Sequence, residues 1–170
     1  DGTGTREVQN SQVLVEFHNA STIRIWLNEQ NSGYPAHWHS AMEIIMPVEN
    51  NYTLVTNNDT YIVEPGNILI VPPGEMHEIV APEFGKRFIF MFDLSLIAKL
   101  NSFSGIESVL SQPLFITEDT HPQIYDEIYQ LLLRMRNEYF SKTEYAELMI
   151  YSLLLNFFVK IGYNHLNTGN

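Results

Sequence analysis

Residues 35–77 read PAHWHSAMEIIMPVENNYTLVTNNDTYIVEPGNILIVPPGEMH, and they contain the clearest strand and turn signals of the chain. His37, His39 and Glu43 occupy odd positions in a run with strand character. Because residues two apart on an extended strand point to the same side, we expect these three side chains to share one face. The sequence therefore predicts a cluster of polar groups on one side of an otherwise apolar strand.

The second half of the stretch brings in one more histidine. Glu64-Pro65-Gly66 is a turn signal before the apolar run 67–71, and the rigid turn Pro72-Pro73-Gly74 follows, leading to His77. If strand 67–71 folds back beside strand 39–47, His77 can reach the cluster. Three imidazoles and a carboxylate that converge inside a small β-barrel form either a metal site or the polar floor of a pocket.

This pattern resembles the cupin superfamily over roughly residues 13–93. The first cupin motif has two histidines one residue apart and a glutamate shortly after; the second has Gly, Pro, Gly and His at fixed spacing. The matching residues here are His37, His39 and Glu43 for the first motif, and Gly66, Pro72, Gly74 and His77 for the second. The glycine that the family places before the first histidine falls at Asn31, and Gly33 lies out of register.

The remaining strand signals agree with a mainly β, antiparallel barrel of about eight short strands, a jelly roll followed by two C-terminal helices. We expect strands at 13–17, 22–27, 41–48, 52–56, 60–63, 68–71, 77–80 and 87–93. In the second of these, Thr22, Arg24 and Trp26 share one face. That face could line a ligand cavity, or it could be a solvated outer face that carries Arg24.

The helical signals come after residue 93. We expect a short helix at 94–100, loop and turn at 102–112, and a last edge strand at 113–117. Two capping-box patterns, Thr120 to Gln123 and Ser141 to Glu144, then predict the starts of two long helices. The second helix is expected to run to about Ile161, with Gly162 as its stop.

The last helix is apolar around most of its circumference. Leu148, Leu155 and Phe158 lie on one broad side, and Met149, Leu153 and Phe157 lie on another. Since one barrel can cover only one of these sides, we expect the other to be buried in a homodimer.

A cupin barrel followed by two helices resembles the N-terminal domain of an AraC-type transcription regulator. The resemblance implies a cupin barrel at 13–117 that senses a small-molecule effector, such as a sugar or related metabolite, and a helical dimerisation segment at 118–170. It also implies a separate helix-turn-helix domain that binds DNA, which we expect to lie outside the present chain. Residues 1–12 are expected to be a disordered or non-native start, because the first methionine is Met42 and the chain is expected to be part of a longer protein.

The candidate site residues follow from these two resemblances. The ligand-binding residues are expected to be His37, His39, Glu43, His77, Arg24 and Trp26, with no catalytic residue. The first four could hold zinc, iron, manganese or nickel. The competing interpretation is a free-standing, metal-dependent cupin enzyme, a dioxygenase or a sugar isomerase, in which the same four residues hold the metal.

Composition narrows the class of protein. The formal charge of −11 argues against DNA binding by this chain itself, because the phosphate backbone requires a basic surface. There is no cysteine and no run of eighteen apolar residues. We therefore expect a cytoplasmic domain with no membrane partner.

Overall fold

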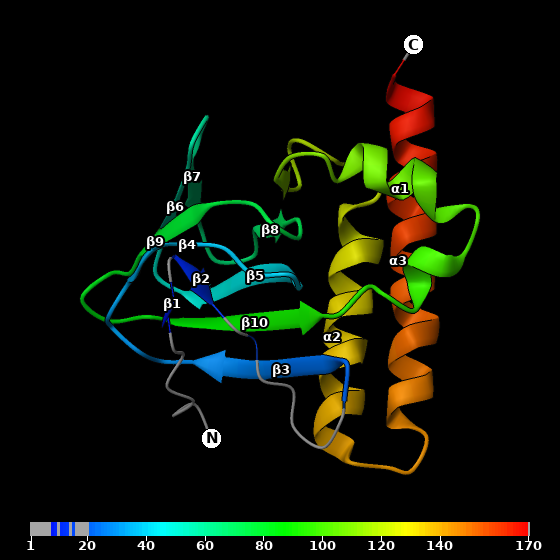
Figure 1. Ribbon diagram of the computed structural model, residues 1–170, viewed down its shortest axis with the longest axis horizontal. Coiled ribbons are helices and arrows are strands. Elements are labelled where there is room, and N and C mark those ends of the chain that lie inside the picture. The colour runs from blue at the N-terminus through cyan, green and yellow to red at the C-terminus, as the bar shows by residue number, and fades with distance from the viewer. Residues whose placement is uncertain (1–7, 10, 14, 16–20, 170) are drawn as a thin grey trace.

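The computed structural model describes residues 8–9, 11–13, 15 and 21–169 (Figure 1). The expected strand at 13–17 and the expected start at 1–12 fall mostly outside these residues. Within them, β1 (Val8–Gln9) pairs with β2 (Gln12–Val13).

Two antiparallel sheets form the barrel. The five-stranded sheet has the order β11-β8-β5-β10-β3, and the four-stranded sheet has the order β4-β9-β6-β7. The strands are β3 (Ile23–Asn28), β4 (Tyr34–His37), β5 (Met42–Glu49), β6 (Tyr52–Thr56), β7 (Thr60–Val63), β8 (Ile68–Val71), β9 (His77–Val80), β10 (Lys86–Phe92) and β11 (Leu114–Ile116). The predicted mainly β jelly roll is confirmed, including the edge strand near residue 115.

Alternation along β10 shows how this sheet is buried on both faces. Phe88, Phe90 and Phe92 belong to the large apolar cluster that includes the helices, whereas Ile89 and Met91 pack with Trp26 on the barrel side. Alternate residues of β10 therefore pack into two different apolar layers, one on each face of the sheet. This explains why the strand reads as a nearly continuous apolar run.

Helices cover the outer face of the five-stranded sheet, as Figure 1 shows for α2 (Tyr125–Ser141) and α3 (Ala146–Thr168). Ile128 and Leu132 of α2, and Leu154 and Phe157 of α3, are fully buried in the same cluster as the outward-facing residues of β5 and β10. The barrel and the helices thus share one core.

Both predicted capping boxes are wrong. The α2 helix begins at Tyr125 with no side-chain cap bond, and Thr120 Oγ1 instead accepts a hydrogen bond from the backbone N–H of Thr117. The α3 helix begins at Ala146, also without a side-chain cap, and the Ser141 hydroxyl donates to the carbonyl of Glu138. Tertiary burial of an apolar face can set helix ends when local capping does not.

Three further expectations differ from the structure. Residues 102–112 contain the helix α1 (Phe103–Val109), and the helix expected at 94–100 is limited to the 3-10 turn η2 (Ile97–Lys99).

The α3 helix continues to Thr168, well beyond Gly162. A Cβ on Gly162 would lie 3.2 Å from the side chain of Ile106. The glycine therefore allows α1 to pack closely on α3 and does not end the helix.

Gly33 lies so close to the backbone of β9 that replacing it with a larger residue should destabilise the domain. A Cβ at Gly33 would lie 2.2 Å from the carbonyl oxygen of Ile79 in β9, so Gly33→Ala must displace β4 from β9. We expect the free energy of unfolding to fall by about 1–3 kcal/mol. Gly105→Ala is the matched control: Gly105 lies in α1 with no atom within 4 Å of its Cβ position, so alanine there should add up to ~1 kcal/mol. Urea denaturation measures both changes, and equal stability of the two variants would contradict the proposed contact.

Candidate functional site

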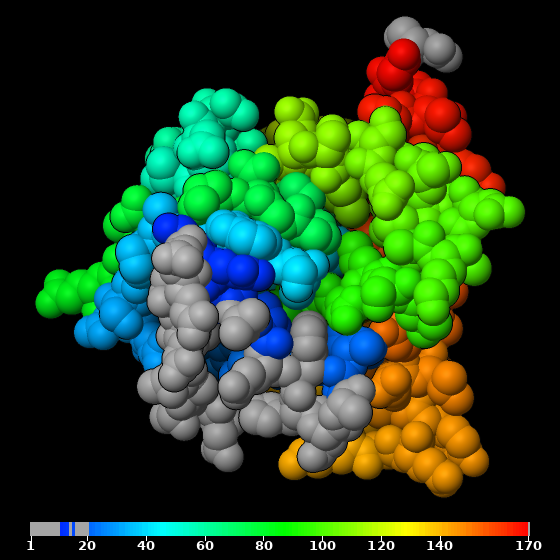
Figure 2. Space-filling model, viewed as in Figure 1, coloured from blue at the N-terminus to red at the C-terminus, as the bar shows by residue number. Residues whose placement is uncertain are grey.

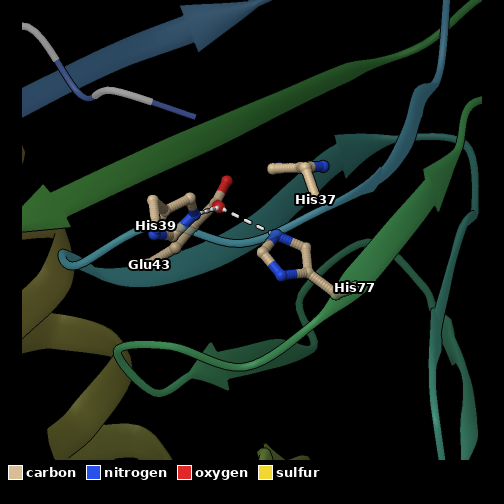
Figure 3. A group of neighbouring side chains, drawn as sticks. All are labelled: His37, His39, Glu43 and His77. Carbon is tan, nitrogen blue, oxygen red and sulfur yellow. Dashed lines mark hydrogen bonds and ion pairs between the residues drawn. The ribbon is translucent and has the colours of Figure 1, made fainter. Parts of the chain in front are cut away.

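Four buried side chains meet inside the barrel (Figure 3): His37, His39, Glu43 and His77. They come from both sheets. His37 ends β4 and pairs directly with His77, the first residue of β9, whereas Glu43 lies on β5 opposite Val71. The expected pairing of strand 67–71 with strand 39–47 is therefore confirmed. The expectation that His37 and Glu43 share one strand is wrong, because the chain crosses from one sheet to the other at residues 38–41.

Backbone carbonyls orient all three imidazoles in the same way. The Nδ1 atoms of His37, His39 and His77 lie 2.7, 2.8 and 2.8 Å from the carbonyl oxygens of Pro35, Ala41 and Glu75. A carbonyl oxygen can only accept, so each Nδ1 must carry the hydrogen. In a neutral ring the lone pair is then on Nε2. The hydrogen bond between His39 Nε2 and Glu43 Oε2 needs one further proton, on either of these two atoms. The local backbone thus fixes the tautomer of each histidine.

The Nε2 atoms of two histidines face the carboxylate. His39 Nε2 lies 2.8 Å and His77 Nε2 lies 3.4 Å from Glu43 Oε2. All four side chains are at most 1% exposed. Burial, and next the neighbouring His77, lowers the pKa of His37 from 6.5 to about 4. His37 is therefore neutral near pH 7, with a lone pair available on Nε2.

These residues fit a divalent metal ion. One donor atom from each side chain lies within 4.8 Å of the other donors. Opposite ligands on an octahedral ion are about 4.2 Å apart, for metal–nitrogen bonds of about 2.1 Å. The spacing of the four donors is therefore close to the spacing that an ion requires. His37 Nε2 is buried without a hydrogen-bond partner among the described residues. Histidines that ligate a metal usually donate their other N–H to a carbonyl or carboxylate, as all three do here. Without an ion, the same groups form a hydrogen-bonded polar floor.

Arg24 and Trp26 lie on the interior side of β3. Arg24 pairs with Met91, which also pairs with Glu43 across β10, so these three residues form one cross-strand row. Paired residues in an antiparallel sheet point to the same face. The Arg24 guanidinium stacks over the Trp26 ring at 4.6 Å from its centroid. Of the two interpretations that the sequence left open, the structure agrees with the inward face.

Sequence analysis did not select Arg87, which the structure places inside the barrel. It lies on the same face of β10 as Ile89 and Met91 and is fully buried. Its even spacing from those two residues was the available signal. A charged residue at the start of a strand is more often exposed, so the residue type suggested the opposite.

A backbone contact also ties the N-terminal segment to the site. Val13 N–H donates to the carbonyl of Trp38 at 2.7 Å, and Trp38 N–H donates to the carbonyl of Ser11 at 2.8 Å. Trp38 lies between two of the site histidines, so residues 11–13 are held beside the cluster.

The comparison with family models agrees with this geometry. Residues 19–154 match the model of the AraC-like ligand binding domain. The chain belongs to this family. No curated protein matches the sequence. The barrel site described above is thus the interior of an AraC-like ligand-binding domain.

One solved structure shares the fold at low sequence identity. Apo ToxT K231A from Vibrio cholerae strain SCE256 aligns with a TM-score of 0.55 and 12% identity over 86% of the present chain and 58% of the ToxT chain. The present chain therefore spans little more than half of that protein. A cupin-2 domain containing protein from Shewanella frigidimarina NCIMB 400 aligns with a TM-score of 0.39 and 17% identity, over 51% of the present chain and 78% of that chain.

By length and composition, α3 could cross a membrane. It is the one such helix among the described residues, with a mean hydropathy of 1.3. However, α3 packs on α1 and α2, and its buried side chains are part of the main core. A core helix of a globular domain has the same composition, so α3 is weak support for a membrane span.

The donor set predicts stoichiometric uptake of a first-row divalent ion. After chelation and reloading with Zn²⁺, Mn²⁺, Ni²⁺ or Fe²⁺, elemental analysis should find about one ion per chain. Glu43→Gln and His77→Ala should each lower the retained metal at least tenfold, because each removes a donor atom. His121→Ala, a histidine outside the cluster, is the matched control. Equal metal content in all variants would show that the ion binds elsewhere.

Proposed function

We propose that this chain is the effector-sensing and dimerisation domain of an AraC-type transcription regulator, and that it binds a small molecule inside the barrel. The observation that carries the proposal is the buried group of three histidines and one glutamate, oriented inward by the backbone. Membership of the AraC-like ligand-binding family supports it. No catalytic residue is proposed.

The effector is a sugar or a related polar metabolite. Imidazole nitrogens and the Glu43 carboxylate can bind its hydroxyl groups directly or through a bound divalent ion. Trp26 offers an apolar ring face, and Arg24, stacked on that ring, adds donors next to it. Together these residues form a polar floor with an aromatic wall.

DNA contact in the regulator would come from a part of the protein other than this domain, which carries a formal charge of −11. A domain of this kind works in the cytoplasm, where the DNA and the metabolite are both accessible. Ligand binding would act by favouring one arrangement of the helices over another.

Dimerisation through α3 is the second part of the proposal. A stripe of apolar side chains on α3 remains exposed, and the C-terminal end of the helix projects from the domain in Figure 2. The stripe consists of Leu148, Leu155, Val159, Tyr163 and Leu166. Phe158, which we expected on the same side as Leu155, is instead buried against Phe103, with ring centroids 5.6 Å apart. The dimer surface is therefore narrower than the sequence suggested.

A metabolite screen tests the sensing function. An effector at a hundredfold excess over its dissociation constant should stabilise the domain by about 2.7 kcal/mol, which is visible as a rise in melting temperature. Arg24→Met and Trp26→Leu should each reduce this rise, because both remove contacts from the wall of the site. Chemical turnover of the bound compound would favour the metal-dependent enzyme and contradict a purely sensory role.

Light scattering tests the dimer. We expect the domain to be dimeric at micromolar concentration, and Leu155→Glu combined with Val159→Glu to produce monomers, because charged groups would be buried at the interface. Phe84→Glu is the matched control, since Phe84 is an exposed apolar residue of the barrel. A monomeric wild-type domain refutes this part of the proposal. A dimer that survives the double substitution places the interface elsewhere.

A further inference from the structure

Arg87 is a buried cation for which the described part of the chain offers no hydrogen-bond partner. It is 0% exposed, and none of its three guanidinium nitrogens has a hydrogen-bond partner in the described part of the chain. The hydroxyl of Tyr52, also buried, lacks a partner there as well. The two side chains are neighbours, because the guanidinium lies 4.3 Å from the centroid of the Tyr52 ring. The ring of Tyr34 is 5.9 Å away.

The buried charge of Arg87 has no counter-charge beside it in the described part of the chain. Arginine stays protonated in proteins, so a buried Arg87 carries its charge. A buried charge is costly unless it is paired, and stacking on aromatic rings offsets only part of that cost. Among the described residues, Glu43 is the one buried acid. A bound anion would supply the missing partner.

The strand register places Arg87 away from the His/Glu cluster. Glu43 pairs with Met91, and Arg87 is four residues from Met91 along β10. At about 3.3 Å per residue, this separates the two rows by ~13 Å. Trp26, Ile89 and Ile45 form the apolar row between them. Glu43 therefore does not neutralise Arg87, and the barrel interior has a polar group at each end.

We propose that the effector carries a carboxylate that pairs with Arg87 and accepts a further hydrogen bond from the Tyr52 hydroxyl. The guanidinium fork matches a carboxylate in a two-point hydrogen-bonded pair. Arg87 is the one buried Lys or Arg among the described residues, so a monoanion balances the local charge, whereas a phosphate dianion would leave a buried negative charge. This inference rests on the proposed sensing function and narrows the effector to acids, such as a sugar acid.

The decisive experiment compares carboxylates with their neutral amides. The probes are acetate and acetamide, benzoate and benzamide, and gluconate and gluconamide, each titrated against the wild-type chain by calorimetry and thermal shift. We expect binding of at least one acid, with its amide at least tenfold weaker. Arg87→Met should weaken that acid about tenfold to a hundredfold, since it removes a charge-assisted pair. Tyr52→Phe should have a smaller effect in the same direction.

A measurement without ligand tests the same idea independently. Because the unliganded Arg87 is an unpaired buried charge, Arg87→Met should leave the melting temperature of the ligand-free chain unchanged or raise it. Arg136→Met is the matched control: Arg136 also stacks on an aromatic ring, at 5.1 Å from the centroid of Phe88, but outside the barrel. This control should leave acid binding unaffected.

The contrary outcomes separate this inference from the proposed function. Amides or neutral sugars that bind as tightly as acids, with no effect of Arg87→Met, overturn the carboxylate inference but keep the sensor. A marked fall in the ligand-free melting temperature of Arg87→Met makes Arg87 a structural residue and overturns the inference. If, in addition, no acid or neutral compound binds, the sensing function fails as well.

Discussion

The site depends on three short hydrogen bonds from imidazole Nδ1 to backbone carbonyls. Each joins a histidine to a carbonyl two residues away, so the local chain conformation sets the ring orientation. The three bonds leave every Nε2 directed to the interior, where Glu43 lies. A buried set of this kind is costly without an ion or a polar ligand, because the groups have lost their water. The chemistry of this cluster therefore favours a bound ion or a polar ligand at this point.

The two sheets contribute site residues, and the helices pack on the outside of one sheet. The four-stranded sheet supplies His37 and His77, and the five-stranded sheet supplies Glu43. The outer face of the five-stranded sheet packs on α2 and α3 in one continuous core. Because β5 and β10 contribute one face to the barrel interior and the other to the helices, a ligand that shifts these strands also shifts the helices. This gives a physical route from an occupied barrel to the exposed stripe on α3.

Much of this could be predicted from the sequence, since the deciding signals are local. The two prolines and the glycine of the turn at 72–74, with the period-two pattern of the strands, predicted the barrel and the approach of His77 to Glu43. The shared-strand argument for His37 and Glu43 failed because the crossover at 38–41 contains no glycine or proline to signal a break. The helices that begin at Tyr125 and Ala146 have no side-chain cap that the sequence could signal. Arg87 has the spacing of an inward residue, but its charge suggested an exposed position.

The backbone presets the tautomers of the three site histidines. Long-range ¹H–¹⁵N NMR of the ¹⁵N-labelled domain measures this directly, because protonated and unprotonated ring nitrogens have well separated shifts. We expect Nδ1 to carry the hydrogen in His37, His39 and His77, both with and without a divalent ion. Spectra in which these rings carry the hydrogen on Nε2 and lack it on Nδ1 would show that the backbone carbonyls do not set the tautomers.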